Sequence, residues 1–327
     1  MKKELAIKLD AGVERGMGHL YRQLHLGKVL QEHGFSPQYF IPEYAPAIEI
    51  LIRENLPFHI TKIEEAWPSN WPTFFEIVIL DRLDTTSEFI AQVRGKAKYI
   101  VDFEDLGPGR NHVDLLIDAN LTEKTSAPTP SSVRTLFGLE NIALHPSFAQ
   151  INRTANRAFS LEPVLICMGG VDPFNVTQKT VQILKSLRPE IDLTVVVGSG
   201  YPWHTRLESL QGTLSFKLER DISNMAERLS QSGSAFCSGG IIMHEAIAAG
   251  AIPLVVSMAE HQTRKALYAQ EKGAALYLGV VEKFNESDVM NALELTAEQL
   301  RQMHEAGRKL IDGKGIFRVV SAIEAMA

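Results

Sequence analysis

The stretch from Ala235 to Gln262 places the strongest constraint on the fold, because two apolar runs flank a double glycine and a helical segment. It predicts a strand, a turn at Gly239 and Gly240, a helix, a second turn and a second strand. Glycine allows a sharp turn with exposed amides, and the following helix adds unpaired N–H groups and the positive end of its dipole. The sequence therefore predicts an anion site with a diphosphate as its ligand, and an ordinary strand–turn–helix unit without a ligand is the alternative.

The same pattern recurs near the start of each half of the chain. Gly16, Gly18 and His19 follow a first short strand and precede a helix, and Met168–Pro173 follows another apolar run. Gly198 ends a further strand. Strands that alternate with helices indicate parallel sheets covered on both faces, with ligands at the carboxyl ends of the strands.

The chain is long enough for two domains of ordinary size. We expect an α/β protein with two Rossmann-like domains, residues 1–155 and 156–327, that face one another across a cleft. A polar stretch near residues 150–160 favours this boundary. The last helix is a candidate for packing back on the N-terminal domain.

Composition excludes several classes of function. The 327 residues carry a net charge of −6 that is spread evenly over both halves, which argues against nucleic-acid binding. The two cysteines, Cys167 and Cys237, are too few for a disulfide framework or a zinc site and suit a reducing cytoplasm. We find no signal peptide and no apolar run of the ~20 residues that a membrane span needs. We expect a cytoplasmic protein without a metal or cofactor, and the sequence leaves its oligomeric state open.

His19 is the strongest candidate for a catalytic group. A helix N-terminus disfavours the imidazolium form, and neutral imidazole near pH 7 is what a general base requires. His19 would deprotonate water in a hydrolase or an acceptor hydroxyl in a transferase. A capping or surface histidine is the alternative. Glu245, inside the helix of the opening stretch, is suited to accept a hydrogen bond from a ligand hydroxyl.

Several short motifs together resemble a known family. The N-terminal half contains Asp10 and then Gly16-Met-Gly18-His19 with Arg22, where the family reads Gly-x-Gly-His-x-x-Arg. The C-terminal half contributes Met168–Pro173, Ser238–Gly240 with Glu245, and Ala259–Gln262. In this order the motifs resemble the GT-B nucleotide-sugar enzymes over nearly the whole chain. They are most similar to the pseudaminic-acid-pathway UDP-sugar hydrolases (PseG-type) and SpsG-like proteins, and more distantly to the MurG-type glycosyltransferases.

The resemblance implies a division of labour between the domains. The C-terminal domain would hold the nucleotide diphosphate, with Glu245 on the ribose hydroxyls and backbone near Gly198 on the base. The N-terminal domain would present His19 to the sugar. The substrate-binding residues that it implies are Asp10, Gly16, Gly18, Arg22, Arg82, Gly169, Gly170, Gly198, Gly239, Gly240, Glu245, His261 and Gln262.

Three departures from the family pattern affect these expectations. Arg82 stands where the hydrolases commonly have an aromatic residue, and it would either bind an acidic sugar or phosphate or lie on the surface. Ile241–Met243 replaces residues with hydroxyl groups, so phosphate binding would depend on backbone amides. His261 replaces a usual asparagine and would either contact the ligand or only begin a helix.

We therefore expect a UDP-sugar hydrolase that cleaves the anomeric C–O bond and releases UDP and a free amino- or deoxy-sugar for nonulosonic acid or surface-glycan synthesis. Transfer of the sugar to an acceptor is the alternative. A non-catalytic protein that binds nucleotide sugars is the third possibility.

Overall fold

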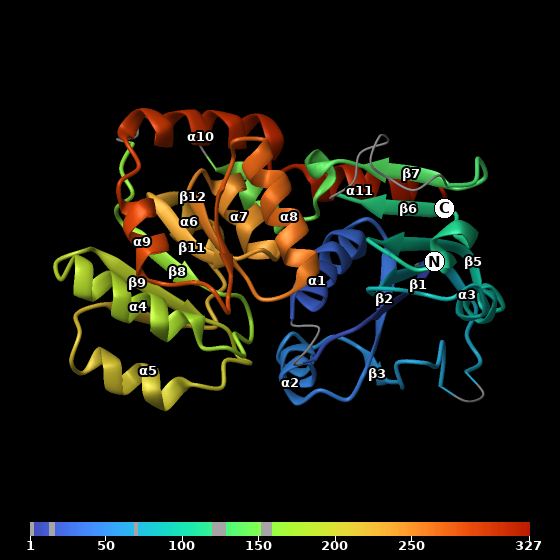
Figure 1. Cartoon of the computed structure of the whole chain (residues 1–327). Coiled ribbons are helices and arrows are strands. Elements are labelled where there is room, and N and C mark those ends of the chain that lie inside the picture. Colours follow the sequence, from blue (N-terminus) through green and yellow to red (C-terminus); the bar gives the residue numbers. More distant parts are fainter. Residues whose placement is uncertain (1–2, 13–16, 69–70, 120–128, 152–158) are drawn as a thin grey trace. The chain divides into compact units, whose positions relative to one another are not determined.

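The computed structural model describes residues 3–12, 17–68, 71–119, 129–151 and 159–327. The chain forms two compact units (Figure 1). Unit 1 comprises Met1–His145 with Lys314–Ala327, and unit 2 comprises Pro146–Gly313. This division falls ahead of the predicted boundary at residues 155 and 156, which lies outside the described residues.

Unit 1 is built on a parallel sheet of seven strands in the order β3-β2-β1-β4-β5-β6-β7. The order reverses between β1 and β4, and open α/β sheets bind ligands at such a point. The strands are β1 (Lys3–Leu9), β2 (Phe35–Ile41), β3 (Phe58–Ile60), β4 (Phe75–Asp81), β5 (Ala97–Phe103), β6 (Leu115–Asp118) and β7 (Arg134–Phe137). The helices are α1 (Gly18–Glu32), α2 (Ala45–Arg53), α3 (Ser87–Arg94) and α11 (Gly315–Glu324), with short 3-10 turns η1 (Pro108–His112) and η2 (Leu139–Asn141).

Unit 2 contains a second parallel sheet, of six strands in the order β10-β9-β8-β11-β12-β13. Its order reverses between β8 and β11, the strands that precede two of the predicted glycine turns. The strands are β8 (Val164–Cys167), β9 (Leu193–Val197), β10 (Lys217–Arg220), β11 (Ser234–Ser238), β12 (Ile252–Ser257) and β13 (Leu276–Val280). The other elements are η3 (Pro146–Gln150), α4 (Val176–Leu187), α5 (His204–Gln211), α6 (Met225–Gln231), α7 (Ile241–Ala249), α8 (Glu260–Glu271), α9 (Glu286–Leu293) and α10 (Ala297–Leu310).

The central strands of each unit explain why the chain adopts parallel sheets. Every residue of β11 and of β12 is buried, as is every residue at the carboxyl end of β1 and β4. Strands covered by helices on both faces need such continuous apolar runs. The expectation of two parallel α/β sheets is confirmed. No helix among the described residues combines the length and the apolar character that crossing a membrane requires.

The C-terminal helix α11 belongs to unit 1. It buries an apolar face that includes Ile316, Val319 and Ile323. Arg318 Nη1 donates to the Glu140 carbonyl at 2.6 Å, which ties the helix to η2. A Cβ at Gly315 would collide with the carbonyl of Ile142, so the start of α11 lies against the backbone of this unit.

Candidate active site

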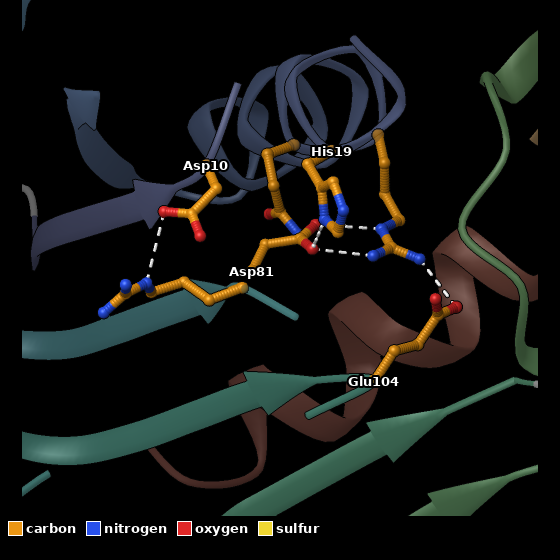
Figure 2. A network of polar contacts seen from close by, with 7 residues as sticks. Asp10, His19, Asp81 and Glu104 are labelled. Atoms are coloured by element: carbon orange, nitrogen blue, oxygen red, sulfur yellow. Dashed lines mark hydrogen bonds and ion pairs between the residues drawn. The ribbon is translucent and has the colours of Figure 1, made fainter. Parts of the chain in front are cut away.

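The sequence-predicted residues fall into two groups, one in each unit, and each group lies where the strand order of its sheet reverses. In unit 1, His19 lies in the first turn of α1 and Asp81 ends β4. The His19 Nδ1 contacts Asp81 Oδ1 directly (Figure 2). The Asp81 side chain is fully buried, whereas that of His19 is 19% exposed. The imidazole therefore has one edge fixed by a carboxylate and remains accessible to solvent.

Asp81 is itself held by two side chains from α1. Arg22 donates to it from Nε at 2.9 Å and from Nη2 at 2.6 Å, and Gln23 Nε2 donates at 2.8 Å. Burial raises the pKa of the carboxyl, but Arg22 and then His19 outweigh this effect and lower the pKa to about 2. Asp81 is thus a carboxylate at neutral pH, with its oxygens in defined positions.

Arg22 connects this pair to a further carboxylate. Its Nη1 donates to Glu104 Oε1 at 2.7 Å, and Glu104 has a left-handed backbone with φ of 52°. Burial lowers the pKa of Arg22, but Asp81 and Glu104 more than compensate and raise it above its ordinary value. Arg22, which the sequence predicted to bind the substrate, is only 6% exposed. Its hydrogen bonds orient Asp81.

The geometry determines which chemistry His19 could perform. A carboxylate accepts a hydrogen bond, so Asp81 favours the tautomer with the proton on Nδ1. The lone pair then lies on Nε2, the arrangement of a general base whose imidazolium form a carboxylate stabilises. The described part of the chain contains no cluster of histidine, cysteine and carboxylate side chains that could hold a metal. Asp81 was absent from the predicted site residues, although its position at a strand end was a usable signal.

Asp10 and Arg82 form a second ion pair at the same edge of the sheet. Arg82 Nε lies 3.2 Å from Asp10 Oδ1, and the guanidinium stacks 4.5 Å from the ring of Phe89. Arg82 is 6% exposed, so the surface alternative for this residue is wrong. Gly18 begins α1, and Gly16 lies outside the described residues.

In unit 2 the predicted glycines meet at the carboxyl edge of the sheet. A Cβ at Gly198 would lie 2.6 Å from the Gly170 Cα, and a Cβ at Gly239 would lie 2.6 Å from the Gln262 carbonyl oxygen. Gly169 has φ of +96°, a conformation that other residues rarely adopt. Backbone packing therefore explains Gly198 and Gly239: the turn after β9 lies against the turn after β8, and the turn after β11 lies against the start of α8.

The two helices that follow these turns differ in their N-termini. Asp172 accepts hydrogen bonds from the amides of Val176 and Thr177 at 2.9 and 2.8 Å, so its carboxylate already occupies the start of α4. By contrast, α7 begins after Gly240 without a side-chain cap. Of the two, α7 therefore has amides available to an anion, and Ile241 supplies no hydroxyl there.

The remaining predicted residues lie beside this turn. Glu245 is half-buried in α7, and burial raises its pKa to about 7. His261 and Gln262 lie in the first turn of α8, where Gln262 Oε1 accepts a hydrogen bond from the Met258 amide at 3.0 Å. A carboxyl group that titrates near neutrality is suited to hydrogen-bond a ligand hydroxyl in either protonation state.

Comparisons with known proteins agree with this architecture. No protein-family model matches the chain. The chain is 24% identical over 335 residues to the spore coat polysaccharide biosynthesis protein SpsG of Bacillus subtilis (strain 168), covering 98% of this chain and 97% of that protein. Among solved structures, it is similar to MurG of Acinetobacter baumannii, with a TM-score of 0.63, 14% identity and coverage of 98% and 99%. It is also similar to the spinosyn rhamnosyltransferase SpnG bound to thymidine diphosphate, with a TM-score of 0.63, 14% identity and full coverage of both chains. The chain therefore has the GT-B fold, and the resemblance predicted from its motifs is confirmed at the level of this fold.

Proposed function

We propose that the protein is a glycosyltransferase that moves a sugar from a nucleoside-diphosphate sugar to an acceptor hydroxyl. The observation that carries this proposal is the contact between His19 and a buried Asp81 whose other hydrogen bonds fix its position. Such a pair is a general base, and activation of a hydroxyl nucleophile is the chemistry that a general base performs in glycosyl transfer.

Unit 2 would hold the donor by its diphosphate. The uncapped start of α7 provides backbone amides and a positive dipole end, which favour phosphate oxygens. The same groups would stabilise the negative charge on the departing nucleoside diphosphate, so bond cleavage does not depend on a metal. Glu245 would accept from the ribose hydroxyls one turn further along the helix.

In the reaction, the acceptor oxygen forms a bond to the anomeric carbon while the bond from that carbon to the diphosphate oxygen breaks. The acceptor proton passes to Nε2 of His19, and the electron pair of the broken bond leaves with the nucleoside diphosphate. The resulting imidazolium is stabilised by the Asp81 carboxylate. Water in place of the acceptor would give hydrolysis by the same steps.

Transfer is preferred over the hydrolysis that we expected first, because the comparisons favour it. A similar solved structure is a rhamnosyltransferase, and the similar Bacillus protein is named for polysaccharide biosynthesis. The structure with thymidine diphosphate also makes thymidine donors candidates alongside the predicted UDP-sugars. Hydrolysis stays a prediction, as does a cytoplasmic location.

The test is a panel of UDP- and TDP-sugars incubated with the protein, with and without candidate acceptor sugars. Free nucleotide, free sugar and product are followed by NMR. Transfer predicts nucleotide release that depends on an acceptor, together with a new glycosidic bond. Release of nucleotide and free sugar at the same rate without acceptor would contradict transfer and support hydrolysis. Binding of donors with no turnover would contradict both.

A further inference from the structure

A second group of charged side chains at the edge of β1 and β4 has no part in the proposed proton transfer. It consists of Lys8, Asp10 and Arg82. The Asp10 amide donates to the Asp81 carbonyl at 3.3 Å, and Arg82 follows Asp81 directly in the chain. The group therefore lies at the same carboxyl edge of the sheet as the proposed base, where open α/β sheets bind their ligands.

Arg82 is oriented before any ligand arrives. Asp10 accepts from its Nε at 3.2 Å, and the face of its guanidinium rests on Phe89 at 4.5 Å. The side chain is more than nine-tenths buried, yet no hydrogen bond or ion pair joins its two terminal nitrogens to any described residue. A guanidinium fixed in this way presents a planar pair of N–H donors, which matches two oxygens of an anion.

The charges around Arg82 leave a local excess of positive charge. Lys8 is 2% exposed and donates from Nζ to Thr61 Oγ1 at 2.8 Å. Burial and then Arg82 lower the pKa of Lys8 to about 8, while Asp10, Glu65 and Glu64 act in the opposite direction. Glu64 is exposed and Glu65 half-exposed, so solvent screens them. Among the buried groups that the structure describes around Arg82, Lys8 and Arg82 therefore have Asp10 as their shared carboxylate.

We propose that the terminal nitrogens of Arg82 bind a carboxylate carried by the donor sugar or by the acceptor. A carboxylate has the two-oxygen geometry that the guanidinium matches, and its single charge balances the one unshared cation. A phosphate monoester carries about −1.5 to −2 charges at neutral pH and would leave an excess of negative charge. This proposal depends on the proposed function in one respect, namely that the bound carboxylate belongs to the donor sugar or to the acceptor of the reaction.

A binding experiment without turnover tests the subsite by itself. Acetate is titrated into the whole protein while the Arg82 Nε–H and Lys8 side-chain signals are followed by NMR. Acetamide and inorganic phosphate serve as the neutral and dianionic probes. We expect acetate to shift both signals and to raise the apparent pKa of Lys8, and acetamide to do neither. Unchanged Arg82 signals with acetate, equal shifts with acetamide, or tighter binding of phosphate than of acetate would overturn the proposal.

Substitutions then connect the subsite to the substrate. Arg82→Gln removes the guanidinium group and its charge. Arg94→Gln is the matched control, because Arg94 forms a half-exposed ion pair with Asp114 in the same unit. We expect R82Q to abolish the acetate effect on Lys8 and R94Q to preserve it. Among substrates that turn over, R82Q should reduce the preference for a uronic acid over its neutral sugar by about tenfold or more, the size of a lost charge-assisted hydrogen bond.

The outcomes separate this proposal from the proposed function. Acetate binding at Arg82 with no turnover on any donor would support the subsite and contradict the transferase. Turnover with an unchanged uronic acid preference in R82Q, or with no preference in the wild-type protein, would overturn the subsite and leave the transferase standing.

Discussion

Asp81→Asn isolates the contribution of the carboxylate that orients His19. The substitution keeps the shape of the side chain but removes its charge, and the new amide can donate to Nδ1. His19 would then carry its proton on Nε2, where the acceptor needs a lone pair. Loss of a general base typically lowers kcat by about 10²- to 10⁴-fold. We expect a fall of this size, with the affinity for nucleoside diphosphate unchanged.

The same substitution has a second, thermodynamic consequence. It leaves the buried Arg22 with Glu104 as its remaining carboxylate partner, and breaking a buried ion pair costs about 3 kcal/mol. The pKa of Asp81 in the folded protein, about 2, lies below its ordinary value, so this carboxylate stabilises the fold above pH ~4. That contribution, on the order of 2 kcal/mol, is lost as the pH falls from ~4 to ~2. The free energy of unfolding of D81N should therefore lack this component of its dependence on pH.

The assay combines steady-state kinetics with chemical denaturation across pH. Glu104→Gln is the matched control, because it removes a partner of Arg22 without touching His19. We expect E104Q to lose stability but to retain most of its kcat, whereas D81N loses both. The reasoning is refuted if D81N keeps the wild-type kcat, or if E104Q and D81N lose activity equally.

Two further predictions concern the glycines and the diphosphate site. Gly239→Ala should destabilise the protein by about 1–3 kcal/mol, because its Cβ would lie 2.6 Å from the Gln262 carbonyl oxygen. Gly18→Ala should leave the denaturation midpoint almost unchanged, because a Cβ at this position meets no atom of the described residues within 4 Å. Equal effects of the two substitutions would contradict this explanation. Titration with UDP should shift the NMR signals of the Ile241 and Ile242 amides and leave those of Val176 and Thr177 in place, because Asp172 already occupies the start of α4. Larger shifts at α4 than at α7 would reverse the assignment.

The sequence predicted the sheets and the glycine turns because these depend on local pattern. Buried parallel strands appear as continuous apolar runs, and the turns after β8 and β11 appear as double glycines. The strand β7 carries no such local signal, because it follows a stretch rich in Thr, Ser and Pro. Its pairing with β6 depends on the sheet edge rather than on its own composition.

Contacts in the candidate site also depend on how distant strands pair, which local sequence patterns do not reveal. His19 was found through its glycine-rich loop, but Asp81 lies 62 residues away and meets it only because β4 pairs with β1. Strand order is a property of the whole domain, so no local pattern predicts this contact. The burial of Arg82 likewise depends on Phe89 in α3 and on Asp10 after β1. The capping of α4 by Asp172 was within reach of sequence reasoning, since an acidic residue before a helix is a common cap.

The measurement that tests the central claim most directly is acceptor-dependent release of nucleoside diphosphate by the wild-type protein, His19→Ala and His33→Ala. His33 is the matched control, because it follows the same helix α1 and pairs with the exposed Glu324. We predict that H19A lowers the acceptor-dependent rate by about 10²- to 10⁴-fold while it still binds the nucleotide, and that H33A reacts as the wild-type does. An H19A rate equal to that of H33A would contradict the account.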